Sequence, residues 1–573
     1  MILTKEKLEK HTPYYYPEGF DVTDWNQVSA AFDELEHKQI DTPRDLLSIL
    51  YQANEIFSML TEKYTEYYFR TLANSEDEEA FTLLQNLSRD VLIPAQKRNA
   101  IILKMYFDHP LRKQLNQENY KQINQFFESA EMQNFEIENE HALEIHDIVA
   151  EYQQAYNQVR VEIDGKEQPL NIINHILIKA EPEQRESIWR ARQQCCLKNK
   201  QHFEDILDRL IKARHRLAKE LGYSSFYEYS LASTIYGKLT VSQVQDIHSS
   251  ISNVILPVVR QFLKQRQKRL NLKTLRPWEL EADPETSSLN PFITTNELVE
   301  KAISILYDLR FEYGILLNKM YNTGLLDLEY RPNKFKGDFF SVLASLGAGN
   351  IMMSCTGQHK DMTMLFHEMG HILQSSMMLR NPLDQFLVTP VQVRELASQT
   401  LVYLSTIGWD LFYPDKQDLK KAFRSLYETD IMQLLYWSMM NNFELVLYSH
   451  PEWTTEQRGK AMLALWKQYD IGVDWSGLED WQSLVWMQEF TLFAIPHYSF
   501  LSALSVFNSW QILRNYRHDA MDTISRFQSF LEKGSDLTTD EVFHELDIKQ
   551  DYSEKNMRKL IDFIQGEYKR IGK

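Results

Sequence analysis

The residues best suited to chemistry lie in one segment, residues 361–371, which reads Asp-Met-Thr-Met-Leu-Phe-His-Glu-Met-Gly-His. His367 and His371 are four positions apart, so on a helix both imidazoles lie on one face and can reach the same metal ion. Glu368 follows the first histidine, where its carboxylate can take a proton from a metal-bound water. The alternative is a pair of core histidines, but buried imidazoles need polar partners. The pattern His-Glu-x-x-His therefore predicts a catalytic metal site.

The apolar residues around this motif predict that it lies on a buried helix. They recur at helical spacing on both sides of the histidines, at Met362, Leu365, Phe366, Met369, Ile372, Leu373 and Met377. Arg380-Asn381-Pro382 then supplies a basic last turn and a proline that stops the helix. We therefore expect a helix that begins near residue 360 and ends near residue 380.

A catalytic zinc site needs a third protein ligand and keeps one position open for water. Between residues 372 and 409 the acidic residues are Asp384 and Glu395, and this stretch has no further His or Cys. Asp384 follows a proline in a turn, where a solvated carboxylate is expected. Glu395 falls on a second helix that should begin at Thr389-Pro390, an N-cap followed by Pro at N1, with Gln392 completing a capping box. We expect Glu395 to be the third ligand, although a surface charge on that helix is the alternative.

The composition indicates that long helices position these residues. The chain of 573 residues has only 18 glycines and 17 prolines, together with 43% hydrophobic and 25% charged residues, which is typical of a folded helical protein. Amphipathic patterns run through the first 157 residues; one of them begins at Thr42-Pro43, an N-cap and N1 pair. We therefore expect a mainly α fold.

Two short segments break the helical pattern. Residues 159–163 alternate apolar and polar side chains before Asp164-Gly165, which predicts a β-hairpin. We place a domain boundary there, with an N-terminal helical lobe at residues 1–158 and a catalytic helical domain at residues 159–573. Residues 329–357 combine glycines with apolar residues and are the best candidate for a small sheet.

Charge and cysteine content narrow the function classes. The net charge of −18 argues against nucleic acid as a partner, because phosphate binding needs clustered Lys and Arg. No uncharged apolar stretch approaches the ~18–20 residues of a membrane span, and the charged N-terminus does not resemble a secretory signal. Three cysteines cannot build a disulfide framework. We expect a cytoplasmic protein that binds neither nucleic acid nor membrane; its oligomeric state stays open.

Two motifs give the chain a family resemblance. His367-Glu368-Met369-Gly370-His371, with Asp361 six residues upstream, and Glu395-Leu396-Ala397-Ser398 resemble the H-E-x-G-H and E-x-x-S motifs of the thimet oligopeptidase / oligoendopeptidase F family of zinc metallopeptidases. Weaker matches extend over about residues 159–545. The resemblance implies a two-lobed helical clam-shell with a small β-sheet beside a deep active-site channel. It also implies one Zn²⁺ per chain and hydrolysis of internal bonds in short unfolded peptides.

The segment that supplies transition-state donors in this family differs here. Thr491 stands where the family has a histidine, and Ser499 and Ser502 align without gaps with its tyrosines. Thr and Ser hydroxyls are too short to reach the same point without a water between them. His497 and Tyr498 lie nearby and are our candidate replacements, although both residues could equally be packing residues.

Further departures leave the level of activity open. A carboxylate that the family repeats seven residues after Glu395 is replaced by Val402, so this support of the metal site is lost. Gly347 and Gly349 are candidates for substrate binding, because a peptide could pair its backbone with a sheet edge formed by residues 347–357. The main hypothesis is a zinc-dependent oligoendopeptidase, since Glu368 is retained. The alternative is a weakly active or inactive zinc-containing homologue that binds peptides.

Overall fold

The computed structural model describes most of the chain. The described residues are 14–17, 19–115, 135–163, 165–170, 173, 176–177, 180–232, 239–281, 289–335, 337–378, 389–533 and 537–571. Asp384, Asp164 and the predicted stop at residues 380–382 lie outside this set. Among the described helices, none is both long enough and apolar enough to cross a membrane.

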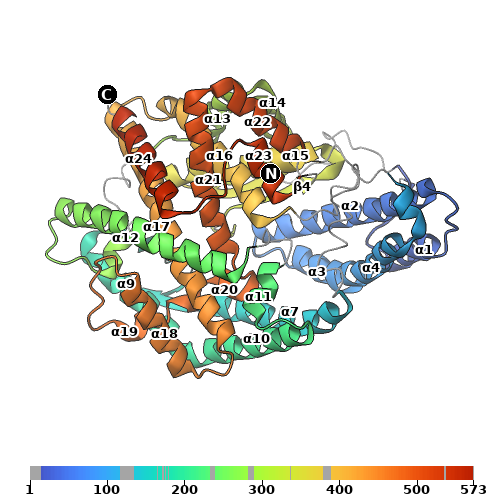
Figure 1. Ribbon diagram of the computed structural model, residues 1–573, viewed down its shortest axis with the longest axis horizontal. Helices are drawn as coiled ribbons and strands as arrows, with labels where there is room; N and C mark the ends of the chain where they lie inside the picture. Colours follow the sequence, from blue (N-terminus) through green and yellow to red (C-terminus); the bar gives the residue numbers. More distant parts are fainter. Residues whose placement is uncertain are drawn as a thin grey trace.

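The first helices pack into a unit at the right of Figure 1. They are α1 (Trp25–Glu36), α2 (Pro43–Ala73), α3 (Glu78–Leu87), the π-helical turn η2 (Ser88–Leu92) and α4 (Ile93–Asp108). Thr42 caps α2 as predicted, because its side chain accepts a hydrogen bond from the backbone N–H of Asp45 while Pro43 takes the first helical position. The apolar faces of these helices meet in a hydrophobic cluster of their own, drawn from residues 22–106.

The next elements lie along the lower part of Figure 1. They are α7 (Phe135–Gln158), β1 (Arg160–Ile163), β2 (Lys166–Pro169), α9 (Pro182–Lys198), α10 (Lys200–Glu220), α11 (Phe226–Ala232), α12 (Val241–Arg269) and η5 (Pro277–Leu280). The predicted hairpin is present, since β1 and β2 pair antiparallel with Ile163 opposite Lys166. Ile148 and Tyr152 of α7 pack in the large core that runs through the rest of the chain. The domain boundary at residue 158 stays a prediction.

A small sheet lies beside the helix that carries the two motif histidines. The elements are α13 (Thr295–Leu309), α14 (Phe311–Asn322), β3 (Leu326–Glu329), β4 (Phe339–Leu343), β5 (Ala348–Cys355), α15 (His359–Met378), α16 (Val391–Ser405) and η8 (Thr406–Leu411). The strand order is β3-β5-β4, with β5 parallel to β3 and antiparallel to β4. The expected small sheet is present: β4 and β5 lie within residues 329–357, whereas β3 begins earlier, at Leu326. The helix α15 matches the predicted helix within two residues.

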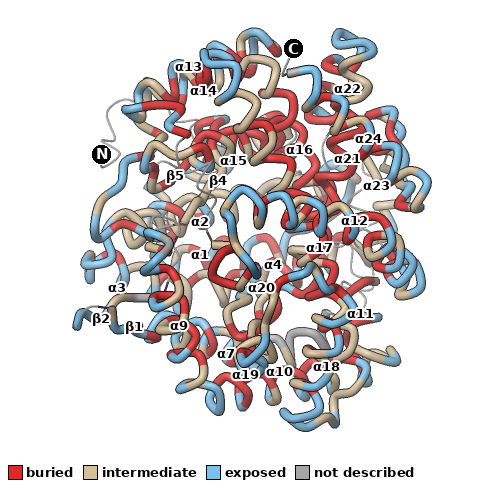
Figure 2. The backbone as a smooth tube through the Cα atoms, turned by 90° about the vertical axis from the view of Figure 1, so that its left-hand side faces the viewer, coloured by how far each residue is buried: buried red, intermediate tan, exposed pale blue. Residues whose placement is uncertain are grey.

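The rest of the chain forms further helices, of which α21 packs against α16 and α22 against α15. They are α17 (Lys416–Ser449), α18 (Thr455–Gln468), α19 (Glu479–Gln482), η9 (Val485–Gln488), α20 (Phe490–Ala494), α21 (Tyr498–His518), α22 (Ala520–Lys533), α23 (Thr539–Glu545) and α24 (Glu554–Ile571). Figure 2 shows α16 and the adjoining part of α21 as largely buried, which agrees with the almost uniformly apolar or hydrogen-bonded residues along both helices. The mainly helical fold is confirmed, while the deep channel stays an expectation.

Two local predictions are wrong. The helix α16 begins at Val391 with Pro390 as its N-cap and no side-chain cap, so Thr389 and Gln392 do not form a capping box. Gln392 is fully buried, and its amide donates to the Tyr552 hydroxyl. The local sequence could not indicate this partner, because Tyr552 is 160 residues away and meets Gln392 only in the folded chain.

Candidate metal centre

Close packing of two helices creates the site. A Cβ at Gly370 would lie 2.4 Å from the Cα of Ser398 and 2.9 Å from the carbonyl oxygen of Ala397. Only glycine permits this approach of α15 to α16 without a shift of backbone. At the start of α15, the Asp361 carboxylate accepts hydrogen bonds from the backbone N–H groups of Thr356 (2.7 Å) and Gln358 (2.9 Å). These contacts fix the position and direction of the helix that carries the histidines.

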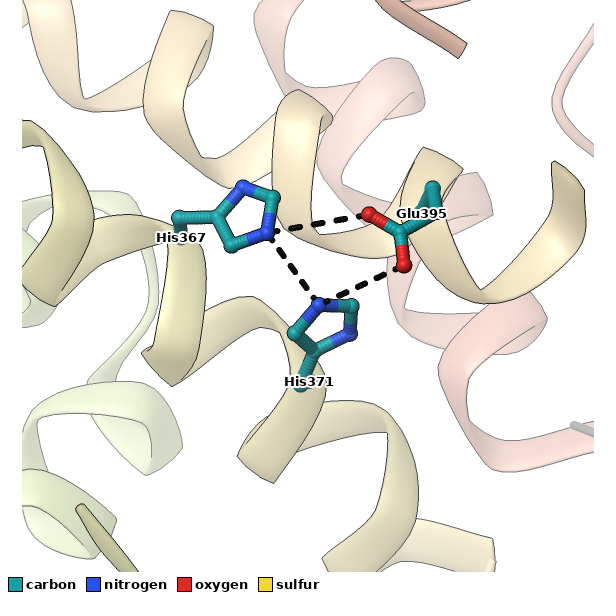
Figure 3. Close-up of side chains that lie close together, drawn as sticks. All are labelled: His367, His371 and Glu395. Carbon is teal, nitrogen blue, oxygen red and sulfur yellow. Dashed lines mark hydrogen bonds and ion pairs between the residues drawn. The ribbon is translucent and has the colours of Figure 1, made fainter. Parts of the chain in front are cut away.

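The structure brings His367, His371 and Glu395 together at this helix pair. The two Nε2 atoms are 3.2 Å apart, and the Glu395 carboxylate lies 3.7 Å from His367 Nε2 and 3.8 Å from His371 Nε2. Figure 3 shows both rings and the carboxylate directed toward a common point. One nitrogen or oxygen atom from each of the three side chains lies within 4.8 Å of the other two, which is close enough for all three to bind one ion. Among the described residues, no other set of His, Cys, Asp and Glu side chains meets this condition.

The charge states of the three side chains suit a cation. Burial lowers the pKa of His371 to about 3 and also lowers the pKa of His367, so both rings are neutral at neutral pH and keep a lone pair for a metal. Burial opposes ionisation of Glu395, but the positive charge of Arg394 and the hydrogen bond from Tyr498 are among the causes that lower the pKa of this carboxyl. The cluster therefore carries one negative charge and no internal cation among its three ligand groups.

The cluster has the dimensions of a zinc site. Zinc binds imidazole nitrogen at ~2.0–2.1 Å with tetrahedral angles, which places two ligand nitrogens about 3.3 Å apart. The 3.2 Å separation of the two Nε2 atoms matches this value, and the carboxylate oxygens are within about half an ångström of it. Two imidazoles and a carboxylate are also a donor set that zinc accepts while leaving a fourth position open. The residues present fit the metal.

Glu368 lies in the same buried helix as the two histidines. Its side chain is 5% exposed, and burial, then the charges of Asp338 and Glu395, raise its pKa to about 8. A carboxylate with a pKa near the working pH can both accept and return a proton. Asp338, just before β4, was not predicted from the sequence, because nothing in its neighbourhood indicates that it lies near the motif.

Two hydroxyl groups of α21 hold the Glu395 carboxylate. The Tyr498 hydroxyl donates to Oε1 at 2.8 Å, and the Ser502 hydroxyl donates to Oε2 at 3.2 Å. Tyr498 and Ser502 are four residues apart and so lie on one helix face. The Arg394 guanidinium lies over the Tyr498 ring, 5.8 Å from its centroid. Tyr498, predicted as a candidate catalytic residue, thus reaches the metal cluster, while its role in the reaction stays a prediction.

His497 occupies a different environment. Its ring is buried between Ser230, 2.6 Å from Nε2, and Asn441, whose amide donates to Nδ1 at 2.9 Å. Its backbone N–H donates to Glu444, and its φ of 64° is in the left-handed region. These contacts describe a packed core histidine; the predicted role of His497 as a transition-state donor stays a prediction.

The serine and threonine at the family's donor positions have separate partners. The Thr491 and Ser499 hydroxyls are 2.8 Å apart and hydrogen-bond to each other. Ser502 instead contacts Glu395, which the sequence could not reveal, because 107 residues separate them. Val402 is 3% exposed in the apolar packing of α16, so the carboxylate position that the family uses has become part of the core.

The two predicted glycines lie at or just before the start of β5, the central strand of the sheet. The strand β5 is central, but its two pairings cover different residues. Residues 348–352 pair with β4, whereas Ile351, Met352 and Cys355 pair with β3, so the strand partner of Gly349 is Val342 of β4. A Cβ at Gly349 would lie 2.1 Å from Cδ1 of Ile372, so glycine is required there for packing against α15. The contact of Gly347 and Gly349 with substrate stays a prediction.

The neighbour of the metal cluster is β4. Its Phe340 ring stacks on the His371 imidazole with centroids 4.6 Å apart and an angle of 14° between the planes. On its other face, Phe339 packs against Tyr68 and Phe69 of α2. The strand β4 is thus held between α15 and α2 and lies at one edge of the described sheet.

Comparison with known proteins identifies the family. The model of Peptidase family M3 matches residues 176–560, and no curated protein sequence matches the chain. A solved structure of a putative oligoendopeptidase F superposes with a TM-score of 0.86 at 16% identity, covering 96% of this chain and 97% of that one. PZ peptidase A with an inhibitor gives a TM-score of 0.86 at 17% identity, covering 98% and 99% of the two chains.

A third solved structure, a putative oligoendopeptidase F from Bacillus anthracis str. Ames, gives a TM-score of 0.81 at 17% identity and covers 98% of each chain. At such identities the likeness shows the fold, whereas the family match covers more than half of the sequence and confirms the resemblance carried by the two motifs. The chain belongs to peptidase family M3 and is a metallo-endopeptidase, a hydrolase acting on peptide bonds.

Proposed function

We propose that the protein is a zinc-dependent oligoendopeptidase that hydrolyses internal bonds of short unfolded peptides. The observation that carries the proposal is the convergence of His367, His371 and Glu395 on one point, with Glu368 buried beside them. One Zn²⁺ held by these three ligands supplies a Lewis acid for the scissile carbonyl and lowers the pKa of a water in the open position. The distances and charge states of the cluster support zinc as the cofactor.

Glu368 acts as the general base in this proposal. Its carboxylate takes a proton from the attacking water and returns it to the leaving amine. The raised pKa, with burial as its main cause, supports this role, because the carboxyl can carry the proton between the two steps. Tyr498 reaches the same site through Glu395 and is the donor residue best placed to approach a developing oxyanion.

Peptide substrates would bind along β4. An extended chain can add to a strand at the edge of a sheet through backbone hydrogen bonds, and β4 is such an edge strand next to the metal cluster. Strand addition needs an unfolded substrate, which supports short peptides and not folded proteins as the substrate class. We place the protein in the cytoplasm, with short peptides as its partners.

The test combines metal analysis with peptide cleavage. Glu395→Gln is expected to lose most of the bound zinc, since a neutral amide replaces the charged ligand. Glu368→Gln should keep the metal and lose ~10²–10⁴-fold in turnover of a quenched fluorescent peptide. A chelator should abolish cleavage, and zinc should restore it. The exposed Glu452 provides the matched control as Glu452→Gln. Full zinc content in Glu395→Gln would contradict the ligand assignment.

One observation favours slow turnover. Thr491 and Ser499 bond to each other, and a single missing oxyanion donor costs ~10²–10³ in rate in well-studied hydrolases. A weakly active homologue that mainly binds peptides is therefore the second candidate. Peptides of about 5–20 residues separate the two: tight binding with negligible chelator-sensitive cleavage supports the binder, and multiple turnovers support the peptidase.

A further inference from the structure

A large cavity lies apart from the metal cluster, between α9, α12, α17 and the segment from Trp466 to Glu489. Its volume is about 600 Å³, which falls among sites that hold small organic ligands, roughly 300–1,000 Å³. None of its described lining residues belongs to α15 or α16, the helices of the metal cluster. Gln433 at its rim is exposed, so the cavity opens to solvent.

One wall of this cavity is aromatic. The Trp189 and Trp475 rings are 6.0 Å apart between centroids, and the Trp475 and Trp466 rings are 5.2 Å apart. Tyr156 and Tyr436 also line the space. The faces of such rings attract cations and pack against alkyl chains.

Glu489, a carboxylate that forms no ion pair with a described residue, completes the lining. The Tyr436 hydroxyl donates to Oε1 of Glu489, and in the described part of the chain no side chain or backbone group donates to its Oε2. The cation that lines the cavity, Arg192, forms an ion pair with Glu281. Burial raises the pKa of Glu489 to about 7, as expected for a carboxyl that lacks a counter-charge. The Gln488 amide, next to Glu489 in the chain, donates to Gln193.

We propose that this cavity binds a ligand with a primary ammonium group on an apolar stem. The ammonium donates to Oε2 of Glu489 beside the aromatic wall, and the stem lies against Leu280, Met432 and Val485. A lysine residue of a peptide and a free alkylamine share this chemistry. The site is separate from peptide hydrolysis at the metal cluster and does not depend on it.

Ligand binding is measured on the full-length protein labelled with 5-fluorotryptophan, by ¹⁹F NMR. The probes are n-pentylamine and Nα-acetyl-lysine amide, with 1-pentanol and Nα-acetyl-norleucine amide as neutral counterparts of equal length. Either amine should shift the resonances of Trp189, Trp466 and Trp475 saturably, and its neutral counterpart should bind about tenfold more weakly or worse. The amine that binds more tightly identifies a free amine or a peptide lysine as the source. Equal binding of charged and neutral probes, or no saturable shift, would overturn the proposal.

Variants locate the binding energy. Glu489→Gln keeps an acceptor for Tyr436 but removes the charge, so amine affinity should fall about tenfold or more while affinity for the neutral probes is unchanged. Glu452→Gln, at an exposed carboxylate elsewhere, should bind the amines like the wild type. Trp466→Leu keeps Glu489 and should also weaken amine binding, which covers the case of a poorly folded Glu489→Gln protein. Unchanged amine affinity in Glu489→Gln or in Trp466→Leu would contradict the assignment.

Discussion

The hydroxyl of Tyr498 donates a 2.8 Å hydrogen bond to Oε1 of Glu395, so a residue of α21 fixes a carboxylate of α16. Ser502, one turn later, fixes the other oxygen at 3.2 Å. Groups that orient a ligand are a common part of metal sites and raise their affinity. The position seven residues after Glu395 is the apolar Val402, and among the described residues the hydroxyls of Tyr498 and Ser502 hydrogen-bond to the Glu395 carboxylate.

Tyr498→Phe tests this role directly. The change removes the hydroxyl and keeps the ring, and we expect zinc affinity to fall ~10–100-fold, the range found when a group that supports a ligand is removed. Competition with a fluorescent chelator measures the zinc dissociation constant. Tyr516→Phe, on the same helix, is the matched control and should leave the affinity unchanged.

The same variant separates support of the ligand from a role in the reaction. If zinc affinity stays at the wild-type value while kcat falls ~10-fold or more with little change in KM, Tyr498 acts on the transition state instead. Ser502→Ala should then lower zinc affinity and leave kcat of the zinc-loaded enzyme unchanged. Among the described residues, the Ser502 hydroxyl forms a hydrogen bond only with the Glu395 carboxylate.

Gly370→Ala should damage both stability and metal binding. The added methyl would lie 2.4 Å from the Ser398 Cα, so α15 and α16 must move apart, and overpacking of this kind costs ~1–3 kcal/mol or more. Separation of the helices also moves Glu395 away from the histidines. We expect a lower Tm and weaker zinc binding, measured by thermal unfolding and chelator competition.

Gly566 provides the control for this change. It is an exposed residue within α24, and a Cβ there would meet no atom within 4 Å. Gly566→Ala should therefore raise stability by about 0.5–1 kcal/mol, because alanine favours a helix over glycine. A wild-type Tm in Gly370→Ala would mean that the helices of the site can separate at no cost.

The sequence predicted the parts of the site that depend on local pattern. The helix around His367 and His371 follows from apolar spacing, and Glu395 follows from the scarcity of ligand types near the motif. The predicted capping box at the start of α16 was wrong, because the Gln392 side chain contacts Tyr552 and not a local backbone group. The contact between Tyr498 and Glu395 could not be predicted, since 103 residues separate them and helix packing alone determines which hydroxyl meets the carboxylate.

The sheet shows the same limit. Residues 329–357 were expected to form a small sheet with an edge at residues 347–357, but strand order is a long-range property that no local pattern encodes. The parallel pairing of β5 with β3 places it in the centre of the sheet. The edge beside the metal cluster consequently belongs to β4.

His497→Ala distinguishes a core histidine from a transition-state donor. The ring satisfies Ser230 and Asn441 in the interior, and each buried group left without a partner costs ~1–3 kcal/mol. We expect a clear drop in the free energy of unfolding, with zinc affinity and kcat per folded molecule near the wild-type values. His497→Asn should be milder, since asparagine tolerates the left-handed backbone found here. A stable His497→Ala protein with kcat lowered ~10-fold would instead make His497 a donor.

The last prediction concerns pH and His248. Its ring is 3% exposed, with Nδ1 2.7 Å from the Ser438 hydroxyl and Nε2 3.1 Å from Oδ1 of Asn441. Burial lowers its pKa to about 3, whereas in the unfolded chain a histidine takes up a proton near pH ~6.5. Between these values the unfolded state binds one more proton than the folded state, so acid favours unfolding.

The contribution of His248 to stability is therefore complete well above pH ~6.5 and begins to fall as the pH approaches that value. Well below it the loss approaches about 1.4 kcal/mol for each pH unit, until the folded ring also titrates. His248→Gln removes the titrating group and keeps hydrogen-bonding capacity toward Ser438 and Asn441. The difference in unfolding free energy between wild type and variant, measured by denaturant titration, should thus shift in favour of the variant by about 1 kcal/mol between pH 6.5 and pH 5.5. His146→Gln, at an exposed position, should follow the wild type at both pH values. A difference for His248→Gln that does not change with pH would show that the buried ring takes up its proton as readily as a solvated one.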